Sequence, residues 1–495
     1  MSEDDIQPEE SELIRVRREK LDRIAALGYD RFPTTADVDT TIAEVVARFG
    51  AKSHDELDAE KPRVKIAGRV MTIREFGKTA FLVLSEKTAN IQVYCRKDTL
   101  PEREWSLYQN LDAGDWISAE GTVLRTKTNE LSVKAQHIDF LVKALRPLPG
   151  KWHGLTDVEQ RYRQRYVDLI VNDDVKAVFE ARAKIVRHIR NWFDGHGFIE
   201  VETPMMQPIA GGAAARPFVT HHNALDMDLY LRVAPELYLK RLIVGGMHRV
   251  YEINRNFRNE GISMRHNPEF TMLEFYQAYA DYEVLIEETE DLLSGLVEGS
   301  VTYRGNEISF KRPFARYTMK EAIAHFSGGS ISIDELDPIS DALIERLIPA
   351  EEREGLFSEG KRLAALFEAV AEKHLIQPTF ITDFPTEVSP LSKQRRDDPR
   401  YVERFELFIG GMEIANAFSE LNDPDEQDRR FRQQLAARER GDDEAHQMDE
   451  DYVRALEYGM PPTGGEGIGI DRLAMVLTDS ATIRDVILFP LMRPR

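Results

Sequence analysis

The chain has 495 residues, and 42% of them are hydrophobic, which is enough for several domains with cores of their own. Its single cysteine, Cys95, excludes an intramolecular disulfide framework and a cysteine-rich metal site. The formal net charge of −21 argues at first against a nucleic-acid partner, because phosphates attract a basic surface.

The charge is unevenly distributed along the chain, which weakens that objection. Residues 61–150 hold 15 lysines and arginines against 10 acidic residues, a surplus of five positive charges. Solvated faces of small β domains often carry such a surplus, so it is weak support for nucleic-acid binding. The N-terminus has no apolar signal segment and no later run is long enough to span a bilayer, so we expect a cytoplasmic protein without a membrane partner.

The first third of the chain predicts a helix, a small barrel and a linker. Residues 11–28 place apolar side chains at helical spacing and end at Gly28, a typical helix C-cap. Residues 64–141 contain five short alternating segments, which predict a β-barrel of the OB type. RPLPGKWHG is rich in proline and glycine and indicates a linker. The expected divisions are a helical extension at 1–60, an OB-fold domain at 61–145 and a linker at 146–160.

From residue 161 the chain mixes long helices with strands. The strands bracket helices without a regular βαβ alternation, which favours an antiparallel sheet flanked by helices. A charged helical stretch at about residues 330–375 interrupts the strand pattern and predicts a helical insertion. The predicted fold class is therefore α+β, with an N-terminal OB-fold barrel and a second domain at residues 161–495.

The segment at residues 257–279 concentrates charged and aromatic side chains around one loop. Arg258 lies on the polar face of an alternating strand before the loop. After the loop, Phe270, Glu274 and Tyr276 share one face of a second strand. The pair of strands predicts a cleft for a nucleotide triphosphate and a small charged substrate. The alternative is a surface hairpin with solvated charges.

A second hairpin is predicted at residues 405–420, where a Gly-Gly pair closes the turn. This turn places Glu413 opposite Phe408 and diagonal to Glu406, so both carboxylates are within reach of one hard cation. Magnesium held by one or two carboxylates and by substrate phosphates is the expected ion. The alternative is two solvated glutamates on an exposed strand.

The same hairpin predicts an irregularity in its second strand. Asn416, Phe418 and Glu420 alternate onto the face opposite to Glu413. A β-bulge between Glu413 and Asn416 is therefore required if all of these side chains line one cleft.

Several short motifs along the chain resemble those of class II aminoacyl-tRNA synthetases, specifically the bacterial lysyl-tRNA synthetases. FIEVETP resembles motif 1, FRNE with RHNPEF resembles motif 2, and GIGIDRLAM resembles motif 3. APELYLKRL, EVSPLSK and ANAFSELNDP also match, and the resemblance covers essentially residues 11–495. It implies an enzyme that activates L-lysine with ATP, transfers it to the 3′ end of tRNA(Lys), and forms a homodimer through motif 1.

The resemblance also implies a role for each matching residue. Arg258 and Arg472 are the implied catalytic residues, near the α-phosphate and the γ-phosphate of ATP, and Glu406 and Glu413 are the implied magnesium ligands. The implied ATP site comprises Arg258, Glu260, His266, Asn267, Phe270, Glu406 and Arg472. The implied lysine site comprises Gly212, Glu236, Glu274, Tyr276, Asn416, Phe418 and Glu420.

For the predicted barrel, Phe81 and Gln92 lie on adjacent strands, where an aromatic ring can stack on an unpaired base and an amide can bind its edge. In the resembled family this surface recognises the anticodon, with Arg74 and Glu130 as neighbours. The alternative for Phe81 is a position in the barrel core.

The predicted chemistry needs positioning and charge neutralisation rather than a protein nucleophile, because the attacking lysine carboxylate is already an anion. Glu236 and Glu420 present two negative charges to the substrate side chain, which favours lysine. The alternative for Glu236 is a structural ion pair with Lys240 or Arg241 on one helix. The alternative functions are an aspartyl or asparaginyl enzyme of the same subclass, and a non-catalytic RNA-binding paralogue.

Overall fold

The computed structural model describes residues 8–87, 89–149, 155–213, 215–353, 355–438 and 448–494. Residues 150–154 of the predicted linker and residues 1–7 of the predicted helical extension lie outside these ranges. The chain divides into two compact units, Met1–Lys176 and Ala177–Arg495. Within the described ranges, no helix is both long enough and apolar enough to cross a membrane.

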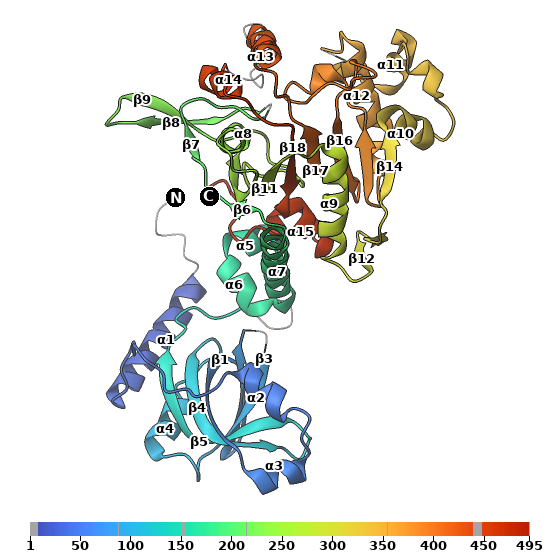
Figure 1. Cartoon of the computed structure of the whole chain (residues 1–495). Coiled ribbons are helices and arrows are strands. Elements are labelled where there is room, and N and C mark those ends of the chain that lie inside the picture. Colours follow the sequence, from blue (N-terminus) through green and yellow to red (C-terminus); the bar gives the residue numbers. More distant parts are fainter. Residues whose placement is uncertain are drawn as a thin grey trace. The chain divides into compact units, whose positions relative to one another are not determined.

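In the first unit, five strands close into a barrel in the order β1-β2-β3-β5-β4 (Figure 1). Alternate residues of each strand fill the interior, as Ala80, Leu82 and Leu84 do on β2. The predicted OB-type barrel is therefore confirmed. Its strands are β1 (Arg63–Phe76), β2 (Thr79–Glu86), β3 (Ala89–Arg96), β4 (Trp116–Arg125) and β5 (Leu131–Val142).

Short helices accompany the barrel. Leu21 and Ile24 of the first helix are buried in the barrel's hydrophobic cluster. That helix ends at Ala26, and Gly28 follows with a φ of +84°, which glycine adopts without steric strain. The helices of this unit are α1 (Pro8–Ala26), α2 (Ile42–Phe49), α3 (His54–Glu60), α4 (Glu102–Tyr108), α5 (Val158–Arg163) and α6 (Arg165–Val171); α7 (Asp173–Gly195) begins at its end.

The second unit is built on one large sheet with the strand order β14-β15-β16-β17-β18-β11-β10-β6 (Figure 1). The strands from β15 to β10 are antiparallel, whereas the outer pairs β14–β15 and β6–β10 are parallel. The α+β class is confirmed, and the sheet is mixed rather than antiparallel throughout. Its strands are β6 (Ile199–Glu200), β10 (Arg249–Phe257), β11 (Glu269–Ala278), β14 (Ala315–Thr318), β15 (Thr379–Thr382), β16 (Arg404–Ile409), β17 (Met412–Ser419) and β18 (Thr463–Gly469).

The parallel pairs follow from the long connections between their strands. Two parallel neighbours need a crossover of a dozen residues or more, whereas a tight turn joins only antiparallel strands. Helices supply the crossover between β14 and β15, in the segment where a helical insertion is predicted. They are α10 (Met319–Phe326), η1 (Ile333–Glu335), α11 (Asp341–Leu347), η2 (Ala350–Glu352), α12 (Glu359–Val370) and η3 (Glu372–His374).

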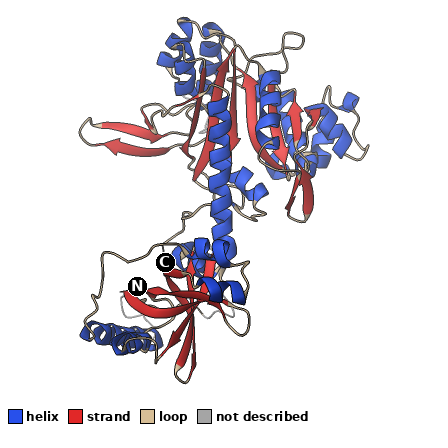
Figure 2. Cartoon of the chain, turned by 60° about the horizontal axis from the view of Figure 1, so that its bottom comes forward, coloured by secondary structure: helices blue, strands red, loops and turns tan. Residues whose placement is uncertain are grey.

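Smaller sheets and further helices complete this unit. Figure 2 shows the hairpin of β8 and β9 projecting away from the large sheet, while the helices between β14 and β15 lie near its opposite end. The remaining elements are β7 (Met206–Gln207), β8 (Phe218–His222), β9 (Met227–Leu231), β12 (Ser300–Tyr303), β13 (Asn306–Ser309), α8 (Glu236–Val244), α9 (Tyr282–Ser294), η4 (Thr386–Val388), α13 (Pro424–Arg438), α14 (Glu450–Glu457), α15 (Ile470–Leu477) and η5 (Ile483–Asp485).

Alternation along the central strands separates an apolar face of the sheet from a polar one. On β11, Leu273 and Phe275 pack into the main core, with residues from α7, α9 and α15. Glu274 and Tyr276 on the same strand point to the opposite face and line a pocket. The core helices thus hold one side of the sheet, and the other side is available for a site.

Candidate functional site

In the hairpin of β10 and β11, Asn256 pairs with Phe270 and Glu252 pairs with Glu274. Arg258, Phe270, Glu274 and Tyr276 all line one pocket. The alternative of a solvated surface hairpin is therefore wrong.

The pocket has a volume of about 410 Å³ and collects side chains from distant parts of the second unit. Glu420 lies behind its wall: it is buried, and a Cβ on the lining residue Gly465 would meet its Oε1 at 2.1 Å. Only glycine at position 465 leaves room for Glu420 and for the neighbouring ring of Tyr276. The predicted residues that line the pocket are Gly212, Glu236, Arg258, Glu260, His266, Asn267, Phe270, Glu274, Tyr276, Glu406, Glu413, Asn416, Phe418 and Arg472.

Arg258 is the cation of the pocket best placed to receive an anion. Its guanidinium carbon lies 5.1 Å from the centroid of the Phe270 ring, and its Nε is buried without a hydrogen-bond partner among the described residues. Burial lowers the pKa of Arg258 from its ordinary value. A buried guanidinium with free donors is a strong site for a phosphate or a carboxylate.

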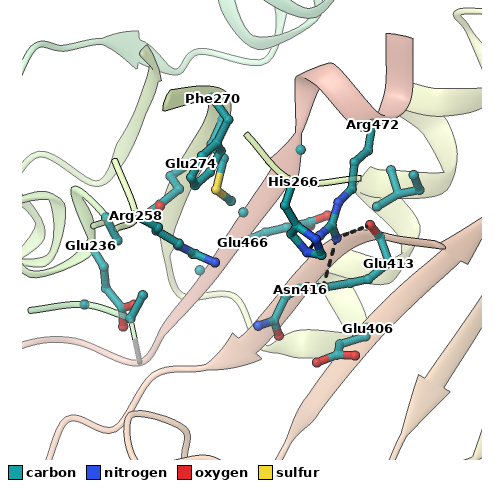
Figure 3. A pocket seen from close by; sticks show the side chains of 18 of the residues that line it. Glu236, Arg258, His266, Phe270, Glu274, Glu406, Glu413, Asn416, Glu466 and Arg472 are labelled. Atoms are coloured by element: carbon teal, nitrogen blue, oxygen red, sulfur yellow. Dashed lines mark hydrogen bonds and ion pairs between the residues drawn. The ribbon is translucent and has the colours of Figure 1, made fainter. Parts of the chain in front are cut away.

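Arg472 enters the pocket from another side, as Figure 3 shows. Its Nη1 donates to the backbone oxygen of Glu413 at 2.8 Å and lies 3.2 Å from Glu413 Oε2, while its Nη2 lies 3.1 Å from His266 Nε2. Burial, and then the Arg472 charge, lower the pKa of His266, which favours the neutral ring that can accept this hydrogen bond. The two catalytic arginines predicted from distant motifs thus meet in one pocket.

The second hairpin has the predicted turn and the predicted bulge. Phe408 pairs with Glu413, but Leu407 pairs with Ala415, so Ile414 is the extra residue on β17. This single insertion brings Glu413 and Asn416, which are three positions apart, to the same pocket. The β-bulge is therefore confirmed.

Glu406 is held by an arginine that the sequence reasoning missed. Arg404 Nη2 lies 2.5 Å from Glu406 Oε1, and Arg404 Nε donates to Asn416 Oδ1 at 3.0 Å. Burial raises the pKa of Glu406 to about 8; Arg404 opposes the rise and the Glu413 charge adds to it. Arg404 precedes Glu406 by two positions on one strand, so the two side chains lie on the same face of the sheet. This alternation could have identified Arg404 from the sequence.

The two carboxyl groups of Glu406 and Glu413 fit a hard divalent cation. They supply oxygen ligands, and the buried Glu406 carboxyl is destabilised in its ionised form, which a cation would offset. Among the described residues, no group of three or more His, Cys, Asp or Glu is placed to hold a metal ion. A pair of carboxylates that leaves the other positions to phosphate and water is the arrangement Mg²⁺ uses.

At the other end of the pocket, Glu236 and Glu420 share a resident cation. Lys240 Nζ lies 2.5 Å from Glu236 Oε1 and forms a second ion pair with Glu420. The ion pair between Glu236 and Lys240, which the sequence suggested as an alternative role for Glu236, is thus present. Arg241 pairs with Asp449 and not with Glu236. Glu236 nevertheless lines the pocket, so the pair does not remove it from the site.

Glu274 is a further buried carboxyl group that lines the pocket. Burial, and then the charge of Glu236, raise the pKa of Glu274 to about 8. Tyr276 Oη donates to Glu274 Oε2 at 3.3 Å. Gly212 approaches this region closely, because a Cβ there would lie 3.0 Å from Glu236 Cβ, and its φ of +92° also favours glycine.

In the barrel, the predicted anticodon residues lie on the outer surface. Phe81 pairs with Arg74 on one side and with Tyr94 on the other, and its ring stacks on Tyr94 with centroids 5.0 Å apart. Phe81 alternates with buried residues and is itself partly exposed, so the alternative of a barrel-core position is wrong. Sequence reasoning missed Tyr94, although strand pairing places it beside Phe81.

Gln92 and Glu130 are also outside the barrel core. Gln92 is partly exposed on β3, and its Oε1 accepts a hydrogen bond from Ser132 Oγ at 2.9 Å. Glu130 is exposed just before β5. Arg74 is exposed on β1, so all four predicted residues are accessible to a ligand of the barrel.

Comparisons with known proteins agree with this arrangement. Residues 157–493 match the family of class II tRNA synthetases (D, K and N), and residues 64–141 match the OB-fold nucleic acid binding domain. The chain is 54% identical to the lysine–tRNA ligase of Pelotomaculum thermopropionicum, over 98% of this chain and 96% of that protein. It is 52% identical to that of Moorella thermoacetica and 53% identical to that of Carboxydothermus hydrogenoformans, each over 98% of this chain and 99% of the relative.

Both matched regions lie in one chain, which aligns with these relatives over nearly its whole length and theirs. The chain therefore belongs to the class II tRNA synthetases of the D, K and N group, and within that group to the lysine–tRNA ligases.

Proposed function

We propose that the chain activates L-lysine with ATP to form lysyl-adenylate and diphosphate, and then transfers lysine to the 3′ end of tRNA(Lys) with release of AMP. One observation carries the proposal: a single pocket is lined by the anion-binding Arg258 and Arg472 and by the acid Glu236, and the buried Glu420 shares the Lys240 ion pair with Glu236. A triphosphate and an amino acid with a cationic side chain have complementary charges to these two ends.

Activation forms a bond between a lysine carboxylate oxygen and the α-phosphorus of ATP and breaks the bond from that phosphorus to the leaving diphosphate. The attacking oxygen is already anionic, so no protein base has to remove a proton. Arg258 binds the α-phosphate and the substrate carboxylate, which brings the reacting atoms together and neutralises the developing charge. Arg472 binds the γ-phosphate, and the free face of Phe270 stacks on adenine.

The remaining ATP contacts come from the loop between β10 and β11. Glu260, His266 and Asn267 line the pocket beside Arg258 and Arg472. The neutral ring of His266 accepts a hydrogen bond from Arg472 and so orients that guanidinium for phosphate.

Glu406 and Glu413 are the proposed ligands of Mg²⁺. The ion would supply positive charge against the phosphate oxygens of ATP. Arg404 and Arg472, which pair with these carboxyl groups in the structure, keep the two side chains oriented toward the pocket.

Lysine is selected by the acidic end of the pocket. Glu236, Tyr276 and Glu420 bind the side-chain ammonium, whereas Gly212, Glu274 and Asn416 lie at the α-amino and carboxylate end, and Phe418 packs on the aliphatic chain. An uncharged side chain would leave buried carboxylates without a counter-charge, which is strongly unfavourable. In the second step, the 3′-hydroxyl of tRNA attacks the mixed anhydride and releases AMP.

The barrel is the proposed anticodon-binding surface. Phe81 with Tyr94 forms a stacked aromatic pair on the outside of the barrel, and base stacking on such rings is a common way to hold unpaired nucleotides. Gln92, Arg74 and Glu130 are the proposed polar contacts around it. The local surplus of positive charge in residues 61–150 supports this placement.

We also propose a homodimer formed around β6, the edge strand of the large sheet. Ile199 on this strand is 53% exposed, and the apolar side chains of Met206 on β7 and Val219 on β8 are 57% and 60% exposed. Exposed apolar groups near an open sheet edge favour association. Sedimentation velocity tests this part, and a monomer at micromolar concentration would contradict it.

ATP–pyrophosphate exchange with each of the twenty amino acids tests the activity. Exchange is expected with L-lysine far above all others. Exchange with aspartate or asparagine in place of lysine would contradict the substrate assignment, and no exchange with any amino acid would contradict catalysis.

A further inference from the structure

The buried lysine of the acidic cluster has no role in the activity proposed above, although it touches both acids. Lys240 is fully buried on α8, and its ammonium contacts Glu236 from the same helix and Glu420 from the end of β17. The side chain of Glu236 is 7% exposed and that of Glu420 is 0% exposed. An internal ammonium therefore already lies where the side chain of substrate lysine is expected to bind.

The charges of this cluster leave room for one more cation. Burial raises the pKa of Glu236 and of Glu420, and the Lys240 ammonium is the main group that opposes the rise. With both acids ionised and Lys240 protonated, the cluster has one net negative charge. Glu274, whose pKa burial raises to about 8, contributes little charge at neutral pH.

The contacts of the cluster are also incomplete. Among the described residues, Glu420 Oε1 has no hydrogen-bond partner, while Glu420 Oε2 forms the ion pair with Lys240. The Lys240 ammonium is 5.3 Å from the centroid of Phe418 and 6.0 Å from that of Tyr276, both of which line the pocket. The acids can therefore bind a second ammonium from the pocket side, next to these rings.

We propose that Lys240 is a specificity-determining residue: its ammonium contacts Glu236 and Glu420, holds them in place and favours their ionised forms, so that the site favours a cationic side chain. The inference rests on the proposed activation of lysine. Lys240 acts through the two acids, so it is a positioning residue and not a catalytic one.

Removal of the ammonium has a specific consequence. Two adjacent buried carboxyl groups without a cation favour uptake of a proton. One proton only restores the single net negative charge that the cluster has with Lys240. When both acids are protonated, the acidic end is uncharged and rejects an uncharged side chain less strongly. The discrimination between L-lysine and L-norleucine, which has the same chain without the ammonium, is therefore expected to decrease.

The decisive measurement is kcat/KM for L-lysine and for L-norleucine in ATP–pyrophosphate exchange, which does not require tRNA. Lys240→Met is expected to lower the lysine-to-norleucine ratio by at least about tenfold while the KM for ATP stays within about twofold. Lys143→Met is the matched control, because Lys143 is also fully buried and paired with two carboxyl groups, but in the barrel. The control is expected to keep the wild-type ratio.

A second variant separates charge from packing. Lys240→Ala removes the atoms of n-propylamine, so added propylammonium is expected to restore lysine-dependent exchange, whereas n-propanol of the same shape is not. Wild-type enzyme with the same additives corrects for competition with the substrate. Equal restoration by the alcohol, or none by either compound, contradicts the role of the charge.

The outcomes distinguish this inference from the proposed function. Wild-type enzyme that shows no lysine-dependent exchange contradicts the proposed function itself. Wild-type exchange with an unchanged lysine-to-norleucine ratio in Lys240→Met contradicts the role of Lys240 alone. Circular dichroism of each variant confirms that the comparison is made between folded proteins.

Discussion

Both units of the chain contain a fully buried lysine between two carboxyl groups, but only one of these clusters is satisfied. In the first unit, Lys143 Nζ donates to Asp112 Oδ2 at 2.6 Å, to Asp115 Oδ2 at 2.7 Å and to the backbone oxygen of Asn110 at 2.8 Å. Its three donors are therefore all used. Asp115 also accepts hydrogen bonds from the backbone nitrogens of Asp112 and Ala144.

In the second unit, Lys240 has two acidic partners and aromatic neighbours, and Glu420 keeps acceptors unused among the described residues. The cluster around Lys143, called the closed cluster below, has no donor left for a ligand, and it joins the end of the barrel to the turn after α4. The cluster around Lys240, called the incomplete cluster below, adjoins a pocket that Glu236 lines. A buried ion pair thus indicates a binding site where its hydrogen bonds are incomplete and a cavity is adjacent.

The largest expected effect is on the closed cluster. Lys143→Met leaves two buried aspartates without their cation, so the free energy of unfolding is expected to fall by about 3–5 kcal/mol. Urea denaturation followed by tryptophan fluorescence measures this change. Lys78→Met, at an exposed position on the same barrel, is the control and should have little effect. A loss below about 1 kcal/mol for Lys143→Met would show that the two clusters do not differ in this way.

The next effect is on the incomplete cluster and concerns activity. Glu420→Gln removes one acceptor charge, so kcat/KM for L-lysine is expected to fall about a hundredfold, with the KM for ATP within about twofold of wild type. Exchange kinetics with each substrate varied separately measure both values. Glu457→Gln, an exposed position on α14, serves as the control. Unchanged lysine kinetics would remove Glu420 from the site.

A third buried carboxyl group sharpens the comparison because, among the described residues, it has no cationic partner at all. Thr289 Oγ1 lies 2.6 Å from the backbone oxygen of Leu285 and 2.7 Å from Glu466 Oε2. The Thr289 hydroxyl is thus a hydrogen-bond donor close to the Glu466 carboxyl group, and this contact opposes the effect of burial on the Glu466 pKa. Burial raises the pKa of Glu466 well above its ordinary value.

The sign of the pH dependence follows from this raised pKa. The folded state retains a proton that the unfolded state loses above about pH 4.5, so the contribution of Glu466 is present below that pH and is lost as the pH rises toward its folded pKa. The loss is at most about 1.4 kcal/mol per pH unit. Melting temperatures measured from pH 5 to pH 9 should fall less in Glu466→Gln than in wild type. Parallel curves would show that Glu466 does not titrate as inferred.

The smallest effect is expected for an exposed ion pair. Arg15 Nη1 lies 2.6 Å from Glu19 Oε1 on α1, but their side chains are 62% and 48% exposed. Solvent screens such a pair, so Arg15→Ala should change the free energy of unfolding by about 0.5 kcal/mol or less. The same urea experiment at low and at high salt measures it. If Arg15→Ala lowered the free energy of unfolding as much as Lys143→Met does, the expected link between the burial of an ion pair and its contribution to stability would be wrong.

Local patterns were sufficient to predict much of the fold and of the site. The alternation of side chains along the strand assigned Phe270, Glu274 and Tyr276 to one face. The Gly-Gly turn predicted that Glu413 pairs with Phe408 across the hairpin. These features depend on neighbours in the chain, so a single sequence contains them. The roles of His266, Asn267 and Arg472 were available only through the family resemblance, since no local pattern connects them.

Tertiary structure alone decided how distant residues meet. Lys240 and Glu420 are far apart in the sequence, and their contact depends on how α8 packs against the end of β17. The orientation of Asn416 by Arg404 and the parallel outer strands likewise depend on packing and on long connections. The sequence by itself therefore determined the strand faces and the chemical groups of the site, because these follow from local backbone geometry. The pairing of its buried charges required the folded chain, because electrostatic contacts depend on distance in space and not on distance along the sequence.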